Sequence, residues 1–218
     1  MPADAPASKL DATREYGAEV ITYERYAEER YAEERYAVLI PPYDYLPVMA
    51  GQGTCGMEIA EEVPNLDALI VCTGGGGFLS GSAIGAKGVQ PNIKLFGAEP
   101  EAGNDVQQAF RSGEIVTIPV PNTICDGQQT QAVGVHPFAV IREHVTDILT
   151  TSDATVIEAM RFAFERMKIV LEPSGACALA TLMTHRKRFS KQRVAVTLSG
   201  GNIDLLRFVR LLGSPQSA

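Results

Sequence analysis

Histidine is scarce, tryptophan is absent and cysteine follows no paired spacing in this sequence of 218 residues. The three histidines do not form a metal-ligand pattern, and we expect each to be a surface or core residue; they are His136, His144 and His185. The four cysteines lie far apart, which excludes the spacings of a zinc site and of a disulfide framework; they are Cys55, Cys72, Cys125 and Cys177. Unpaired cysteines are usual in reducing compartments, so we predict a cytoplasmic protein.

Long apolar runs and an excess of basic residues are also missing. No stretch reaches the length of a membrane-spanning helix, and the first nine residues, MPADAPASK, lack the apolar core of a signal peptide. The net charge of −7 and the isoelectric point near 5.0 are opposite to what nucleic acid favours. The one basic cluster, residues 185–191, is better explained as the C-terminal end of a helix. We therefore predict neither a membrane nor a nucleic acid as a partner.

Glycine, by contrast, is concentrated at one point. Residues 74–77 are four consecutive glycines, placed between an apolar run of strand character at 68–71 and a small-residue sequence of helical character after Phe78. Without a Cβ atom, glycine lets backbone N–H groups approach a ligand closely, and a helix N-terminus carries a partial positive charge. The sequence therefore predicts an anion site at this glycine loop, and phosphate is the anion we expect.

The kind of phosphate compound stays open on these residues alone. The glycines fit no frame of the dinucleotide fingerprint, and Ser82 follows Gly81 without the lysine of a Walker loop. Glu99 ends the next predicted strand, where a ribose-binding acid stands in nucleotide folds. A nucleotide therefore remains the alternative ligand.

Predicted strands and helices alternate along the chain, which indicates an α/β fold with a mostly parallel sheet and helices on both faces. Strands are predicted at 18–23, 68–71, 93–99, 146–151 and 193–202. Helices are predicted at 7–16, 47–63, 78–86 and 104–113, and glycine is expected to loosen the start of the second one. A long loop is expected to run through residue 137, and three more helices follow: one capped by Ser152 or Asp153, one after 171–175, and one that ends at 212. The repeated RYAEE sequence from Arg25 to Ala37 is interpreted as a solvated helix with Arg–Glu pairs. Three glycine-containing motifs follow strands, where open parallel sheets bind ligands, so we expect a small phosphorylated cofactor there.

Five motifs together resemble the serine/threonine dehydratase family. They are VCTGGGGFLSG at 71–81, GAEP at 97–100, TICDG at 123–127, ERMKIVLEPSGA at 165–176 and VTLSGGNID at 196–204. MPADAPASK and AGQGT extend the resemblance almost to the first residue. The family uses pyridoxal 5′-phosphate in the tryptophan-synthase-β-like fold, called fold type II. The resemblance covers nearly the whole chain but only the later part of such an enzyme.

The resemblance implies which residues would hold the cofactor. The backbone amides of the glycine loop would surround its phosphate, with Phe78 completing the turn; the glycines are Gly74, Gly75, Gly76 and Gly77. Ser199 would face the pyridine nitrogen, where a hydroxyl holds a proton less firmly than a carboxylate does. Glu172 would lie near the ring, although an acid at a helix N-terminus explains it equally well.

The resemblance also implies a divalent cation. Related racemases and dehydratases hold one at positions that match Glu99, the carbonyl of Gly103 and Asp105. Oxygen ligands of this kind suit Mg²⁺ or Ca²⁺.

Two family motifs are missing from the sequence. One is the Ser-x-Phe-Lys-x-Arg-Gly-Ala segment with the Schiff-base lysine, and the other is the Ser-x-Gly-Asn-His loop beneath the ring. The lysines of this chain stand in other contexts, so none is predicted to be catalytic; they are Lys9, Lys87, Lys94, Lys168, Lys187 and Lys191. The chain therefore resembles a truncated or split dehydratase, with residues 1–45 a remnant of the smaller domain and 46–218 the C-terminal part of the large cofactor-binding domain.

The expected activity follows from the resemblance. Such an ammonia-lyase converts a hydroxy amino acid, such as serine, threonine or 3-hydroxyaspartate, to a 2-keto acid and ammonia. Without the lysine motif, this chain alone is expected to be inactive. The alternatives are a non-catalytic remnant, a subunit that needs a separate N-terminal piece, and a nucleotide-binding α/β domain. The expected partners are an amino-acid substrate and either a second copy or a complementary N-terminal fragment.

Overall fold

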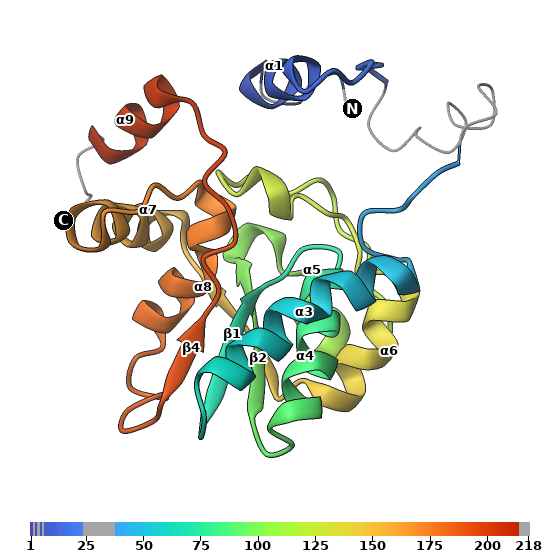
Figure 1. Cartoon of the computed structure of the whole chain (residues 1–218), viewed down its shortest axis with the longest axis vertical. Coiled ribbons are helices and arrows are strands. Elements are labelled where there is room, and N and C mark those ends of the chain that lie inside the picture. The colour runs from blue at the N-terminus through green and yellow to red at the C-terminus, as the bar shows by residue number, and fades with distance from the viewer. Residues whose placement is uncertain (2, 4, 6, 24–37, 214–218) are drawn as a thin grey trace.

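The computed structural model describes residues 1, 3, 5, 7–23 and 38–213 (Figure 1). The repeat from Arg25 to Ala37 lies outside the described residues, so its predicted helix stays a prediction. The strands are β1 (Ala68–Cys72), β2 (Lys94–Pro100), β3 (Asp147–Thr151) and β4 (Val194–Val196). The helices are α1 (Ala7–Glu15), α3 (Leu46–Glu62), α4 (Gly77–Val89), α5 (Asp105–Ser112), α6 (Val135–His144), α7 (Asp153–Phe162), α8 (Pro173–Thr184) and α9 (Leu205–Gly213), with the short η1 (Glu101–Gly103), η2 (Asp126–Gln128) and η3 (Ala163–Met167).

The described strands form one parallel sheet in the order β3-β2-β1-β4. At the centre, β1 pairs with β2 from Ala68↔Lys94 to Cys72↔Ala98. On its other side, β1 pairs with β4, where Ile70 lies opposite Val196. The predicted parallel sheet is therefore confirmed, and the carboxyl ends of β1, β2 and β4 lie at one edge. No described helix is both long and apolar enough to cross a lipid bilayer.

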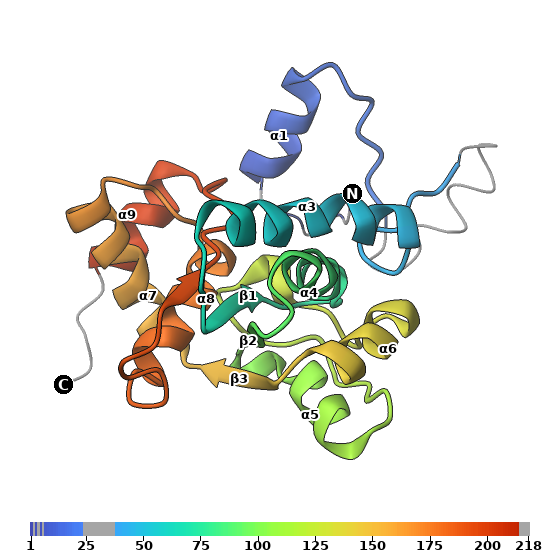
Figure 2. The same cartoon turned by 60° about the horizontal axis from the view of Figure 1, so that its bottom comes forward.

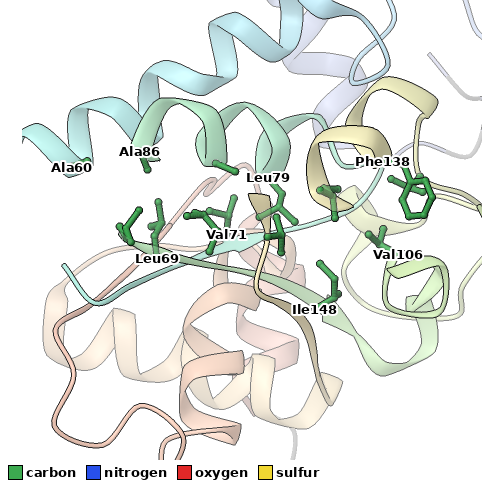
Figure 3. Close-up of a cluster of buried hydrophobic side chains, with 14 of the residues drawn as sticks. Ala60, Leu69, Val71, Leu79, Ala86, Val106, Phe138 and Ile148 are labelled. Atoms are coloured by element: carbon green, nitrogen blue, oxygen red, sulfur yellow. The ribbon is translucent and has the colours of Figure 1, made fainter. Parts of the chain in front are cut away.

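Alternate residues of the central strands face opposite sides of the sheet, and each side is covered by helices. Leu69 and Val71 of β1 belong to the apolar cluster shown in Figure 3, which also includes Leu79 of α4 and Phe138 of α6. Between them in the chain, Ile70 faces the other way, into a cluster with residues of α8. This alternation produces the buried run of β1, and it confirms the prediction of helices on both faces.

Two predicted elements differ from the structure. Residues 18–23 do not form a strand; only Tyr23 makes a bridge, through backbone hydrogen bonds to Met1 and Ala3. A loop was predicted through residue 137, but α6 already begins at Val135. The Asp44 carboxylate accepts hydrogen bonds from the Val135 and His136 N–H groups and so caps the start of this helix. This helix N-terminus is stabilised by a residue far away in the sequence, which local patterns do not reveal.

The glycines of α3 were predicted to loosen the start of this helix, but the helix is continuous from Leu46 to Glu62. Instead, these glycines let the backbones of α3 and α4 pack against each other. A Cβ atom at Gly56 would lie 2.2 Å from the Ser82 carbonyl oxygen, and one at Gly81 would lie 2.2 Å from the Met49 carbonyl oxygen. Figures 1 and 2 show the two helices side by side along this contact. We call this contact the glycine seam; it comprises Gly53 and Gly56 of α3 and Gly81 and Gly85 of α4. It fixes the position of α4, whose N-terminus carries the glycine loop.

The glycine seam predicts opposite effects of the same substitution at two positions in α4. Gly81→Ala should destabilise the chain by about 2–3 kcal/mol, because the methyl group would overlap the Met49 carbonyl and outweigh the gain in helix propensity. Gly88→Ala is the control, since no atom lies within 4 Å of its added Cβ; it should stabilise by roughly 0.5–1 kcal/mol. Denaturant unfolding measures both, and a stabilised Gly81→Ala variant would contradict the seam.

Candidate functional site

The glycine loop forms the turn between β1 and α4, and each of its central residues must be glycine. Gly76 has φ +90°, in the left-handed region that favours glycine, and it immediately precedes α4. A Cβ atom at Gly75 would lie 2.3 Å from the Tyr43 ring. The first N–H groups of α4 have no acceptor one turn earlier in the helix, so they are free to bind an anion.

The loop forms one wall of a cavity of about 370 Å³ at the carboxyl edge of the sheet. The cavity is lined by Pro42, Tyr43, Gln52, Cys72, Gly74, Gly75, Gly76, Gly77, Phe78, Gly127, Gln128, Thr130, Glu172, Ser174 and Ser199. The structure thus brings together every residue that sequence analysis assigned to the cofactor. Glu172 is the N-cap residue of α8, but its side chain makes no capping hydrogen bond and instead lines the cavity.

Ser199 follows β4 and lies beside Cys72 at the end of β1. The Cys72 Sγ and Ser199 Oγ atoms are 3.1 Å apart, within hydrogen-bond distance. Burial raises the pKa of the Cys72 thiol, so the thiol remains protonated at neutral pH. The pair therefore places a neutral hydroxyl and a neutral thiol in the cavity.

Three further polar atoms of cavity residues are buried without a hydrogen-bond partner among the described residues. They are Gln52 Oε1, Gln128 Oε1 and Thr130 Oγ1. A buried polar group without a partner costs roughly 1–3 kcal/mol, which a bound polar ligand would recover. The motifs did not point to these side chains, although Gln128 and Thr130 come just after TICDG and Gln52 lies within AGQGT. The glycine cradle and the Thr130 hydroxyl, which can donate, suit an anion such as phosphate, whereas the two amide oxygens accept hydrogen bonds and need a donor.

Glu99 and Asp105 lie outside this cavity, in the interior between β2 and α5. The Glu99 carboxylate accepts hydrogen bonds from the Val106 and Gln107 N–H groups at 3.1 and 2.9 Å, so it caps α5. Both carboxylate oxygens of Asp105 are buried without a hydrogen-bond partner among the described residues. Glu99 is fully buried, and both of its carboxylate oxygens accept hydrogen bonds from α5. It therefore does not line the cavity where a ribose would lie. This geometry argues against the nucleotide alternative.

The carboxyl groups of Glu99 and Asp105 lie in the protein interior, where a negative charge is unfavourable. Burial and the nearby Asp105 carboxyl raise the pKa of Glu99 well above its ordinary value. Burial raises the pKa of Asp105 to about 7. No cluster of three His, Cys, Asp or Glu side chains suited to a metal ion occurs among residues 1–23 and 38–213 where the structure describes them. A cation held here would therefore need backbone oxygens, such as the Gly103 carbonyl, besides the two carboxylates.

Gln128 connects the two polar regions. Its side-chain N–H₂ group donates to the Thr73 carbonyl at 2.8 Å and to the Ala98 carbonyl at 2.9 Å. Thr73 directly precedes the glycine loop, and Ala98 directly precedes Glu99. The buried amide thus ties the end of β1 to the end of β2, and its oxygen has no hydrogen-bond partner among the described residues.

Comparison with known proteins decides the family. A family model described as pyridoxal-phosphate-dependent enzyme matches residues 1–200. The chain belongs to the pyridoxal-phosphate-dependent enzyme family. The resemblance inferred from the five motifs is therefore confirmed, and so is its fold type II architecture.

Several proteins to which this chain is similar carry the name of a hydroxy amino acid. The L-threo-3-hydroxyaspartate ammonia-lyase of Saccharomyces cerevisiae is 50% identical over 222 residues, covering 99% of this chain and 68% of that protein. The serine racemase of Schizosaccharomyces pombe is 48% identical, covering 97% and 68%. The structure of maize serine racemase superposes with a TM-score of 0.88 at 35% identity, covering 96% of this chain and 67% of that one. The chain thus spans about two thirds of the length of these relatives.

The raised pKa of Asp105 predicts a pH-dependent loss of stability. The folded chain binds this proton more tightly than the unfolded chain does, so stability falls as pH rises from 3.8 toward about 7, and the loss is complete above that. Between pH 5 and 8 with a chelator present, Asp105→Asn should therefore lose less stability than the wild type, by roughly 2–4 kcal/mol.

The measurement is the free energy of unfolding by denaturant across this pH range. Glu101→Gln is the control, because Glu101 is an exposed acid beside the same site. It should follow the wild type. If Asp105→Asn has the same pH dependence as the wild type, the Asp105 carboxyl does not carry the raised pKa.

Proposed function

We propose that this chain is the cofactor-binding portion of a pyridoxal-phosphate-dependent ammonia-lyase. Its substrate would be a hydroxy amino acid such as serine, threonine or 3-hydroxyaspartate, and its products a 2-keto acid and ammonia. The observation that carries the proposal is the meeting of the glycine loop, Glu172 and Ser199 in one cavity. The names of the relatives support the substrate class.

Each cavity wall has a separate task in this proposal. The amides of the glycine loop and the N-terminus of α4 bind the phosphate, because the loop has no side chains to keep an anion away. The buried Thr130 hydroxyl has no partner among the described residues and would donate to the same anion. Tyr43 lies against the loop and excludes water from that side. When bound, pyridoxal phosphate supplies the electron sink that lets the substrate lose its α-proton and hydroxyl.

Ser199 is the proposed partner of the pyridine nitrogen. Its hydroxyl is neutral, and the neighbouring Cys72 thiol is neutral as well. A neutral pair of this kind provides no negative charge to hold a proton on the nitrogen. The ring would then be a weaker electron sink, which favours loss of a β-hydroxyl over transamination.

The boundary proposed between the two domains lies at residue 45, just before α3 begins at Leu46. Residues 1–45 would be a remnant of the smaller domain, and 46–218 would be part of the large one.

None of the six lysines lines the cavity, although all lie among the described residues. This favours a second candidate function, a subunit that binds the cofactor and needs a separate lysine-bearing fragment for catalysis.

Cofactor binding is the direct test of the proposal. Titration calorimetry with pyridoxal phosphate, and separately with inorganic phosphate, should show one site on the wild-type chain. Thr130→Val should weaken both ligands about fivefold to tenfold, because the buried hydroxyl would lose its contact to the anion. Thr181→Val is the matched control, since its hydroxyl is also buried and unpartnered but lies outside the cavity. Equal affinities in the two variants would contradict the assignment.

A cation at Glu99, Gly103 and Asp105 is part of the same proposal. Mg²⁺ or Ca²⁺ at about 100 times its Kd should raise the melting temperature of the wild type by roughly 5–10 °C through ligand linkage. Asp105→Asn should abolish the rise, while Glu101→Gln should keep it. Asp105 is the better target than Glu99, because Glu99 also caps α5. An equal rise in all three proteins would point to weak binding by surface acids.

Catalysis by the chain alone is expected to stay at background. Correct positioning of a reacting group is worth about 7–11 kcal/mol, and no lysine of the described cavity wall supplies that group. Pyruvate release from serine, measured with added pyridoxal phosphate, should match a blank without protein. Adding a family-type N-terminal fragment with the lysine motif should restore activity. Pyruvate release by the chain alone, with one lysine labelled stoichiometrically after borohydride reduction, would overturn this expectation.

A further inference from the structure

Lys9 of α1 contacts two carboxylates at the cavity wall. Its Nζ atom lies 3.0 Å from Asp126 Oδ2 and 2.9 Å from Glu172 Oε2. Figures 1 and 2 both show α1 lying apart from the sheet and its covering helices. The Lys9 side chain is 22% exposed and both carboxylate side chains are 16% exposed, so the pairs are largely shielded from solvent.

Both carboxylates belong to segments that form the cavity. Glu172 itself lines it, and Asp126 begins η2, whose next two residues line it as well. The Gly127 N–H group donates to the Ser174 hydroxyl at 2.9 Å, which joins η2 to the first turn of α8. Lys9 thus joins two cavity walls that are already hydrogen-bonded to each other.

The charges explain why a cation is needed there. Among the side chains that line the cavity, Glu172 is the only carboxylate, and the ligand proposed for the cavity is an anion. Two negative charges in the same cavity repel each other, and partial burial strengthens the repulsion. Burial by itself lowers the pKa of Lys9, but hydrogen bonds to Glu172 and Asp126 outweigh it and raise the pKa, so the ammonium group remains charged.

We propose that Lys9 is a positioning residue that neutralises Glu172 and holds α1 against the cofactor cavity. Binding of an anion in the cavity and docking of α1 would then strengthen each other, because coupling between two sites is reciprocal. The coupling to the anion rests on the proposed function, whereas the docking of α1 does not. Nothing in this assignment makes Lys9 a catalytic residue, since a charged ammonium group is not a nucleophile.

The test compares Lys9→Met with Arg14→Met, which removes a cation from the same helix. Arg14 pairs with Asp11 at the surface, where the two side chains are 51% and 63% exposed. Titration calorimetry with pyridoxal phosphate and with inorganic phosphate gives the affinities. Lys9→Met should bind both ligands roughly tenfold more weakly. Arg14→Met should match the wild type, and Lys9→Arg should restore most of the affinity.

A second variant separates charge from structural damage. If the uncompensated Glu172 carboxylate causes the loss, Lys9→Met combined with Glu172→Gln should bind inorganic phosphate more tightly than Lys9→Met alone. If it binds no better, charge compensation by Lys9 is wrong.

Docking of α1 is read out without any cofactor. The endoprotease that cleaves after glutamate should cut at Glu15 faster in Lys9→Met than in Arg14→Met, and phosphate should slow the cut in the wild type. Equal cutting of the two variants would overturn the docking. A wild-type chain that binds neither ligand would overturn the proposed function and the coupling, while the cutting rates would still decide whether Lys9 docks α1.

Discussion

Backbone contact between α3 and α4 is the constraint on which the site depends. At Gly53, Gly56 and Gly81, a methyl group would overlap a carbonyl oxygen of the opposite helix. Because the helices pack this closely, α4 sits directly over β1, and its first turn continues from the end of that strand. The direction of α4, and with it the direction of the glycine-loop amides, follows from this packing.

Two buried polar side chains, Gln128 and Glu99, hold the carboxyl edge of the sheet together through hydrogen bonds to backbone groups. Gln128 bonds to the carbonyl groups at the ends of β1 and β2, and Glu99 bonds to the first turn of α5. These bonds use both donor hydrogens of Gln128 and one acceptor site on each oxygen of Glu99. The atoms left over, such as Gln128 Oε1 and the Asp105 carboxylate, mark where a ligand would be stabilising.

In the proposed function, the described cavity wall has the parts that bind an anion but no lysine for catalysis. The proposal assigns anion binding to the backbone amides and the Thr130 hydroxyl of the cavity wall, with Lys9 as the compensating cation. Proton abstraction needs an amine at the reacting carbon, and Lys9 is occupied by two carboxylates. The proposal thus makes cofactor binding and catalysis depend on different residues.

The sequence by itself determined the alternation of strands and helices, the parallel sheet, the glycine loop and the family, because apolar periodicity and short motifs are local. It also narrowed the cap of α7 to Ser152 or Asp153, since a capping side chain acts on residues next to it, and the structure shows that Ser152 is the cap. Only the tertiary structure decided that Asp44 caps α6, that glycines join α3 to α4 and that Lys9 reaches Glu172. Each of these contacts joins residues far apart in the chain, and no local pattern encodes the distance between them.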